Sequence, residues 1–300
     1  RWSRGLGDVY KRQPLALRLV IGTTTAEIAR LFLVAPATMA ARITRAKKKI
    51  VTAGIPLSRP VDDELRARLN DVCRTIYLAF TAGYTPGHGP HLLRSDLAGE
   101  ALELAAVTHR LVPEAEQVRA LYALLLLQHA RRDAREREGR LVTLADQDRS
   151  LWHRDELQAG LGLVAELPAL KGYGEELRLQ GLIAVEHARA STAADTDWEA
   201  IAMRYADLEA LTGSPVVRLN RAVAVAETNG ARAGLALLNG LDETLPGNHR
   251  LHAVRADLAR RAGDMGLARA SYAEALKVCA NEMELEHLAA RLDSLDAPGA

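Results

Sequence analysis

Short apolar runs near the start of the chain recur with helical spacing and are separated by turn signals. Pro14 suits the first turn of a helix, and the apolar residues that follow it end at Gly22. Thr24 stands three residues before Glu27, the spacing of a reciprocal capping box, so a second short helix is expected to begin there. Pro36 then predicts a turn, because the residue before a proline resists the helical region.

A longer helix is predicted over residues 37–51. Its apolar residues Met39, Ile43, Ala46 and Ile50 recur at i, i+4, i+7 and i+11, which places them on one face. The basic side chains of this segment fall mainly on the other faces. A short capped helix that supports a second, basic one is the arrangement of a helix-turn-helix, which reads base edges and contacts phosphates.

The remaining residues predict a helical body, joined to this head by a linker at residues 56–63 that contains two prolines. Residues 81–92 predict a loop, residues 97–111 a helix, and Pro113 the start of another helix. The charge run at residues 131–140 is expected to be a solvated helix face. We therefore predict an all-α protein with a head at residues 14–55, a helical domain at 64–190 and tetratricopeptide-like helical hairpins at 191–295.

The last third of the chain contains a period. Gly230 and Gly263 lie 33 residues apart, each between short helical patterns, close to the tetratricopeptide spacing of about 34. The unit after Gly230 is degenerate, with Leu235 and Asn239 where small and aromatic residues are expected. Stacked hairpins leave a concave surface suited to a protein partner, and a closed bundle without a ligand is the alternative. The unit after Gly263 has small, aromatic and small residues in place: Ala268, Tyr272 and Ala275.

The charge is divided unevenly along the chain. The formal net charge is +1, but residues 14–59 carry 8 basic and 1 acidic side chains, whereas residues 60–300 carry 27 and 36. A basic head on an acidic body indicates a nucleic-acid-binding end. Residues 1–13 show no periodicity and look like a translated sequencing-adapter read, so we expect them to be non-native and the natural protein to extend further upstream.

Composition excludes several classes of protein. With 48% hydrophobic and 26% charged residues, the chain is neither disordered nor membrane-embedded, and no membrane partner is expected. Two cysteines, Cys73 and Cys279, stand far apart and form no disulfide framework or zinc module, which suits a reducing cytoplasm.

The densest group of acidic and imidazole side chains comprises Asp146, Asp148, His153 and Asp155. These residue types bind metals or transfer protons, but acids before a helix more often interact with its N-terminus, and we favour that structural role. No catalytic or cofactor-binding motif is present, so we expect neither an enzyme nor a cofactor. Two histidine pairs lack a third ligand nearby: His88 with His91, and His249 with His252.

Two segments of the head carry a family resemblance. Residues 24–29 (TTAEIA) and 38–47 (TMAARITRAK) resemble region 4 of extracytoplasmic-function sigma factors that have a long tetratricopeptide-like C-terminal extension. The turn departs from that family, which often has an acid after the proline where Ala37 stands here. Later blocks also resemble the extension: residues 76–80 (IYLAF), 146–152 (DQDRSLW), 194–198 (ADTDW) and 219–224 (LNRAVA).

The resemblance implies a transcription initiation factor that binds promoter DNA and the RNA polymerase core, with a regulatory helical tail. Region 2, which melts promoter DNA in that family, has no counterpart in this sequence, so we expect these residues alone not to initiate transcription. A helix-turn-helix regulator with a sensory or protein-binding repeat domain is the alternative, and a repeat scaffold with an incidental basic helix is a third. The candidate DNA-binding residues are Thr24, Thr25, Arg30, Thr38, Arg42, Arg45, Lys47, Lys48 and Lys49.

Overall fold

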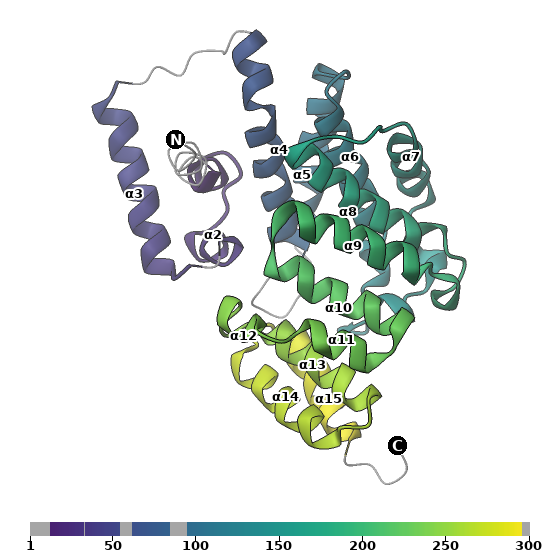
Figure 1. Ribbon diagram of the computed structural model, residues 1–300. Helices are drawn as coiled ribbons and strands as arrows, with labels where there is room; N and C mark the ends of the chain where they lie inside the picture. The colour runs from purple at the N-terminus through teal and green to yellow at the C-terminus, as the bar shows by residue number, and fades with distance from the viewer. Residues whose placement is uncertain (1–12, 33, 55–61, 85–94, 296–300) are drawn as a thin grey trace.

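The computed structural model describes residues 13–32, 34–54, 62–84 and 95–295, and these residues are almost entirely α-helical (Figure 1). The expected all-α fold is confirmed. Among the described residues, no helix is long and apolar enough to cross a membrane.

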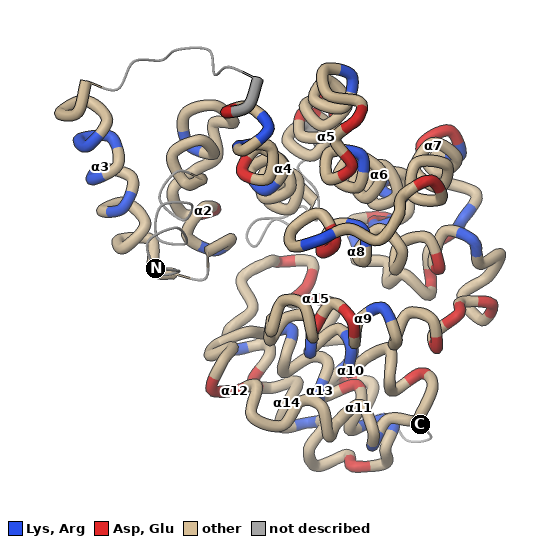
Figure 2. Tube along the Cα trace, turned by 45° about the horizontal axis from the view of Figure 1, so that its top comes forward, with Lys and Arg blue, Asp and Glu red and all other residues tan. Residues whose placement is uncertain are grey.

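The head consists of three helical segments. Residues 13–19 are helical, α2 spans Thr25–Leu31, and α3 spans Pro36–Thr52. The predicted bounds of α3 are therefore correct to within one residue at each end. Figure 2 shows that several positions along α3 are Lys or Arg and that none is Asp or Glu.

The head and the body share one hydrophobic core. Leu17, Ile28 and Met39 from the head are fully buried in the same cluster as Phe80, which belongs to α4 (Asp62–Tyr84). Burial of these side chains favours a fixed position of the head on the body, because each large apolar group contributes about 1.5–3 kcal/mol when it leaves water.

The expected loop over residues 81–92 is wrong in its first part, because α4 continues to Tyr84. Tyr84 is buried and stacks on Phe80 with ring centroids 5.1 Å apart, so packing extends the helix past the polar signals in the sequence. The rest of that expected loop, with His88 and His91, lies outside the described residues.

Antiparallel helices follow one another through the body. The helix α6 is buried on nearly all sides and packs against α4, α5, α7 and α8. It begins at Glu116 rather than at Pro113, which lies in the preceding turn. The bounds are α5 Ser95–Leu111, α6 Glu116–His129, α7 Arg154–Ala165, α8 Gly172–Arg189 and α9 Trp198–Thr212.

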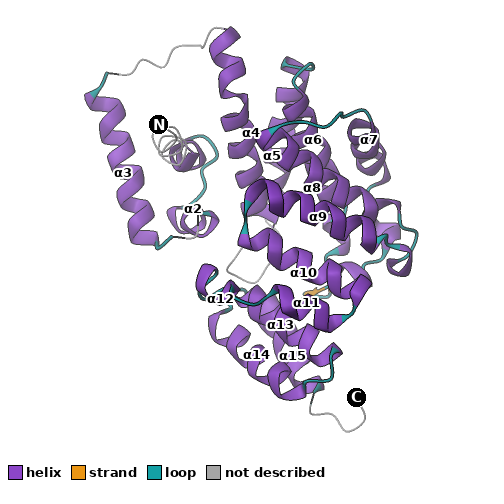
Figure 3. Cartoon of the chain, viewed as in Figure 1, coloured by secondary structure: helices purple, strands orange, loops and turns teal. Residues whose placement is uncertain are grey.

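The charge run at residues 131–140 is not the solvated helix face that we expected. It forms a short 3-10 turn (Arg132–Ala134) and a small antiparallel hairpin, β1 (Glu136–Arg137) and β2 (Arg140–Leu141), shown in Figure 3. The guanidinium of Arg135 lies 3.8 Å from the centre of the Tyr84 ring and donates to the Tyr84 carbonyl oxygen. Arginine side chains of this run therefore serve the packing of the body.

The repeat pattern is confirmed at its turns. Gly230 and Gly263 each lie between two helices, with φ values of +86° and +85° that favour glycine. Ala268, Tyr272 and Ala275 are buried as the small–aromatic–small pattern predicts. The helices of this part are α10 Pro215–Asn229, α11 Ala231–Leu237, α12 Leu241–Thr244, α13 His249–Arg261, α14 Met265–Val278 and α15 Glu282–Ser294.

The degenerate unit does contain a small residue, one position before the expected one. Gly234 of α11 lies so close to α10 that a Cβ atom there would stand 2.6 Å from the Ala222 carbonyl oxygen and 2.8 Å from the Ala226 Cβ. Gly234 thus permits the close approach of α10 and α11, and Leu235 does not need to be small.

We predict that Gly234→Ala lowers the free energy of unfolding by about 1–3 kcal/mol, because the added methyl forces the two helices apart. Urea unfolding followed by circular dichroism measures the change. Gly162→Ala is the matched control: Gly162 lies within α7 with open space around its Cα, so alanine there is expected to stabilise by about 0.5–1 kcal/mol. Equal effects of the two substitutions would contradict the close approach.

Candidate nucleic-acid interface

The capping box predicted at the start of α2 is present. The backbone N–H of Thr24 donates to Oε2 of Glu27 at 2.7 Å, and the N–H of Glu27 donates to the Thr24 hydroxyl oxygen at 3.3 Å. This satisfies N–H groups at the helix start and places the buried residues Ile28 and Ala29 against the core. Thr24 is exposed, but its polar groups already serve the cap.

The orientation of α3 is fixed by its N-terminal half. Pro36 occupies the first turn, while Ala35 provides no side-chain cap. Met39 and Ile43 are buried, but Ile50 at the other end of the same face is 39% exposed. The predicted apolar face is therefore correct for the first turns only, and the C-terminal end of α3 extends beyond the core.

Four of the candidate residues form a stripe along one side of α3. Thr38, Arg42, Arg45 and Lys49 recur at i, i+4, i+7 and i+11 and lie about 100° around the helix from the buried face. All are exposed except Arg42, which is half-buried. At a rise of about 1.5 Å per residue the stripe is about 16 Å long. It is therefore long enough to span a major groove, which is about 12 Å wide.

The three consecutive lysines do not share a direction. Lys48 projects away from the core beside the stripe, whereas Lys47 lies about 170° around the helix from the stripe. Lys47, Lys48 and Lys49 are all exposed. One surface brought against the stripe therefore contacts Lys49 and leaves Lys47 on the opposite flank.

The two other candidates on α2 are less accessible. Thr25 and Arg30 are both half-buried, and Arg30 lies in the last turn of α2, where a cation interacts well with the helix dipole. Burial lowers the pKa of Arg30, and the negative charge of Glu27 partly offsets that effect.

Among the residues that the structure describes, no acidic side chain lies within ion-pair distance of Arg42, Arg45, Lys47, Lys48 or Lys49. The Nε atom of Arg45 donates to the Ala41 carbonyl oxygen of its own helix at 3.2 Å. Since α3 also carries no acidic residue of its own, its positive charge is directed at solvent and is available to an anionic partner.

The acidic and imidazole group in the body does not form one site. Asp148 accepts a hydrogen bond from the Ser150 N–H at 2.9 Å, and Asp146 accepts one from the Thr143 hydroxyl at 2.6 Å. His153 lies instead 2.7 Å from a carboxylate oxygen of Asp133. Local capping and pairing, the role that we favoured, accounts for these contacts.

Sequence reasoning missed an ionic cluster between α6 and α7, in which His129 is buried and Arg132 and Glu156 are half-buried. Nη1 of Arg132 lies 2.9 Å from Glu156 Oε1, and Nδ1 of His129 lies 3.0 Å from Oε2 of the same carboxylate. Burial opposes the charge of Glu156, but the hydrogen bonds and charges of His129 and Arg132 prevail, so its pKa lies below the ordinary value. Arg132 and His129 precede Glu156 by 24 and 27 positions, and the sequence offers no signal for this pairing.

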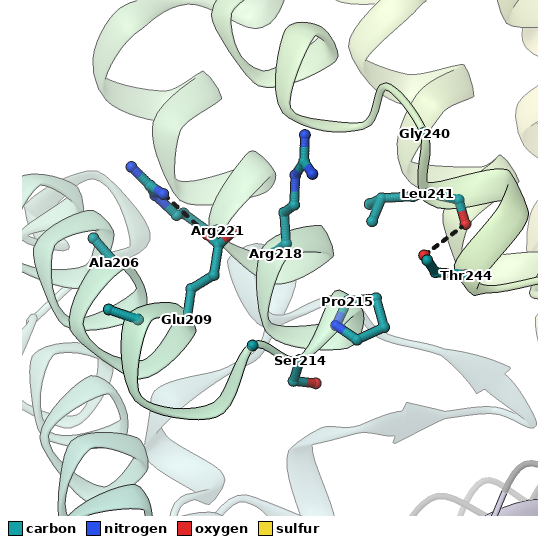
Figure 4. A pocket seen from close by; sticks show the side chains of 11 residues that line it. Ala206, Glu209, Ser214, Pro215, Arg218, Arg221, Gly240, Leu241 and Thr244 are labelled. Carbon is teal, nitrogen blue, oxygen red and sulfur yellow. Dashed lines mark hydrogen bonds and ion pairs between the residues drawn. The ribbon is translucent and has the colours of Figure 1, made fainter.

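One pocket lies at the start of α10 (Figure 4). Its volume is about 490 Å³, and Glu209, Arg218 and Arg221 line it. Arg221 donates to Glu209 at 2.9 Å, and Arg218 donates to the carbonyl oxygen of Asn239 at 3.3 Å. Arg221 therefore links α10 to α9, and Arg218 links α10 to the turn after α11.

A second cavity of about 420 Å³ lies among α4, α8, α9 and α10. Its lining includes the Tyr77 hydroxyl, which donates to Gln180 Oε1 at 2.5 Å. Burial raises the pKa of Glu176, and burial together with nearby arginines lowers the pKa of His187 to about 4, so His187 is neutral at pH 7. A cavity of this size and polarity suits a small polar molecule.

Comparison with known proteins gives two similarities. Residues 68–167, from α4 to α7, match a family of unknown function, DUF6596. The uncharacterized protein R00370 of Rhizobium meliloti (strain 1021) is 40% identical over 287 residues, which cover 95% of this chain and 68% of that protein. No solved structure matches the chain.

We predict that Glu156→Gln lowers the free energy of unfolding at pH 7 by about 1–3 kcal/mol, because Arg132 then loses its half-buried carboxylate partner. The pKa of Glu156 lies below its ordinary value of 4.5, so its stabilisation is present above pH 4.5 and is lost as the pH falls through the folded-state pKa. Urea unfolding at pH 7 and below pH 4 should therefore show the difference between wild type and variant shrinking in acid.

The matched control is Glu166→Gln at the C-terminal end of α7. Glu166 is 74% exposed and lies 3.8 Å from Arg119, so its ion pair is expected to contribute less than about 0.5 kcal/mol. Similar losses for the two variants would show that burial does not strengthen the Glu156 cluster.

Proposed function

We propose that this chain, which belongs to the same protein family as R00370 of Rhizobium meliloti, is a sigma-type transcription initiation factor. In this proposal the chain recognises promoter DNA through α3. The observation that carries the proposal is the basic stripe on α3, which packs on the capped helix α2 and has no acidic partner among the described residues. The proposal assigns the chain no catalytic activity and no cofactor.

The stripe suits the division of labour in a major-groove helix. Thr38 and Arg42 lie toward the N-terminal end, where side chains of such helices meet base edges. Arg45 and Lys49 lie further along the same side, where they would contact phosphates on the groove wall. Promoter DNA is the proposed partner of this face, and the RNA polymerase core is the partner that the sigma resemblance implies.

The helical body supports this function by holding the head in a fixed position. Leu17, Ile28 and Met39 share a core with α4, so the stripe has a fixed direction relative to the body. A protein bound on the repeats would therefore also be fixed relative to the DNA. We propose that the body regulates promoter binding by holding such a protein in a fixed position relative to the DNA.

The alternative function is a helix-turn-helix regulator whose body senses a small molecule, and the cavity that includes Tyr77, Glu176 and Gln180 favours it. Such a regulator binds DNA without RNA polymerase. Both functions use the same face of α3, and they differ in whether the core enzyme is a partner.

We predict that Lys49→Ala weakens binding to a mixed-sequence DNA duplex and lowers the slope of log affinity against log salt by about 1, because one phosphate contact is lost. Lys47→Ala, the same substitution on the opposite flank of α3, is expected to leave the slope unchanged. Fluorescence anisotropy at several salt concentrations measures both. Equal slopes for the two variants would contradict the assignment of the stripe.

A second measurement separates the two functions. The immobilised chain is expected to retain purified core RNA polymerase, and competition with an unrelated sigma factor should release the enzyme. DNA binding without retention of the core enzyme would favour the ligand-sensing regulator.

A further inference from the structure

Three potential metal ligands meet where the last helices of the chain converge. His249 opens α13, Cys279 follows α14, and Glu284 lies in the first turn of α15. Their Nε2, Sγ and carboxylate oxygen atoms all lie within 4.8 Å of one another. Asn248 and Asn281 cap α13 and α15 through their side chains, which stabilises the start of the two helices that carry His249 and Glu284.

An ion pair alone does not account for this geometry. The His249 Nε2 atom is buried and lies 2.9 Å from Glu284 Oε2, yet it has no hydrogen-bond partner among the described residues. The Cys279 Sγ atom approaches the same oxygen at 4.0 Å. A nitrogen, a sulfur and an oxygen atom from three side chains therefore lie close together, and hydrogen bonding among the described residues does not account for the nitrogen.

The other oxygen of the carboxylate is already held. Oε1 of Glu284 accepts a hydrogen bond from Arg250 at 3.0 Å, which leaves Oε2 directed toward His249 and Cys279. Such an outer partner orients a ligating carboxylate.

We propose that His249, Cys279 and Glu284 bind a divalent zinc ion. Thiolate, imidazole and carboxylate are its usual donors, and the thiolate disfavours magnesium and calcium. Zinc bonds of about 2.0–2.3 Å place tetrahedral ligands about 3.3–3.8 Å apart, so the three atoms need to move by less than about 1 Å. The thiol proton is released when the metal binds, and water fills the fourth position.

The bound ion would link three elements at the end of the stack. The helix α15 packs on α14 and reaches β2, while α13 packs on both α11 and α14. A metal shared by α13, the end of α14 and α15 would therefore hold the last helix on the preceding hairpin. Terminal units of helical stacks have a neighbouring repeat on one side only, so a metal link would add to the contacts that hold α15 in place.

Cobalt(II) is the probe, because it takes zinc sites and shows a near-ultraviolet absorption when a thiolate binds it. The whole chain, reduced and free of any affinity tag, is titrated with cobalt and then with zinc. We expect one equivalent of cobalt to produce the thiolate absorption and zinc to remove it. Zinc should also raise the melting temperature by mass action.

The variants assign the ligands. Cys279→Ser is expected to abolish the thiolate absorption, whereas Cys73→Ser should retain it, since Cys73 lies in the core shared by the head and α4. His249→Gln and Glu284→Gln should each weaken zinc binding at least about tenfold. Circular dichroism verifies that each variant is folded.

Two results would overturn the proposal. One is a wild-type chain that shows no thiolate absorption with cobalt and no change in melting temperature with zinc; the cluster would then be an ion pair beside a thiol. The other is an absorption that persists in Cys279→Ser and disappears in Cys73→Ser. Should Cys279→Ser fail to fold, unchanged zinc affinity in both His249→Gln and Glu284→Gln would also count against the site.

Discussion

The packing of α3 on α2, and of α2 on α4, is the constraint on which the rest of the head depends. Met39 and Ile43 insert into the same core as Phe80, and this fixes the rotation of α3 about its own axis. Once that rotation is set, helical geometry decides which basic side chains share a surface. Lys47 and Lys49 are two residues apart, yet they belong to opposite flanks of the helix for this reason.

Local signals in the sequence predicted local structure well. The capping box at Thr24, the bounds of α3 and the turns at Gly230 and Gly263 each depend on residues that are close together in the chain. The sequence does not predict the end of α4, because Tyr84 is held by Arg135, which is 51 positions away. Contacts of that kind leave no periodic pattern, and the Gly, Pro and His residues of the stretch by themselves indicate a loop.

Charge counts along the chain do not distinguish a binding face from a packed interior. The basic residues of α3 have no acidic partner among the described residues, whereas Arg132 and Arg135 turn toward Glu156 and Tyr84. The difference is that α3 contains no acid and has one side outside the core. The excess of positive charge in the head was therefore predictable from the sequence, but the direction of each side chain required the structure.

This chain is neither an open stack of hairpins nor a closed bundle, because its last helix packs back against the middle of the chain. Successive helices pack as in a repeat array, yet α15 also reaches the hairpin strand β2. His249, Cys279 and Glu284 lie at this return, and the charge of Glu284 also acts on Arg135. No spacing rule pairs residues 249, 279 and 284, since only the return of α15 brings them together. The same packing that closes the stack thus creates the one cluster that suits a metal among the residues described.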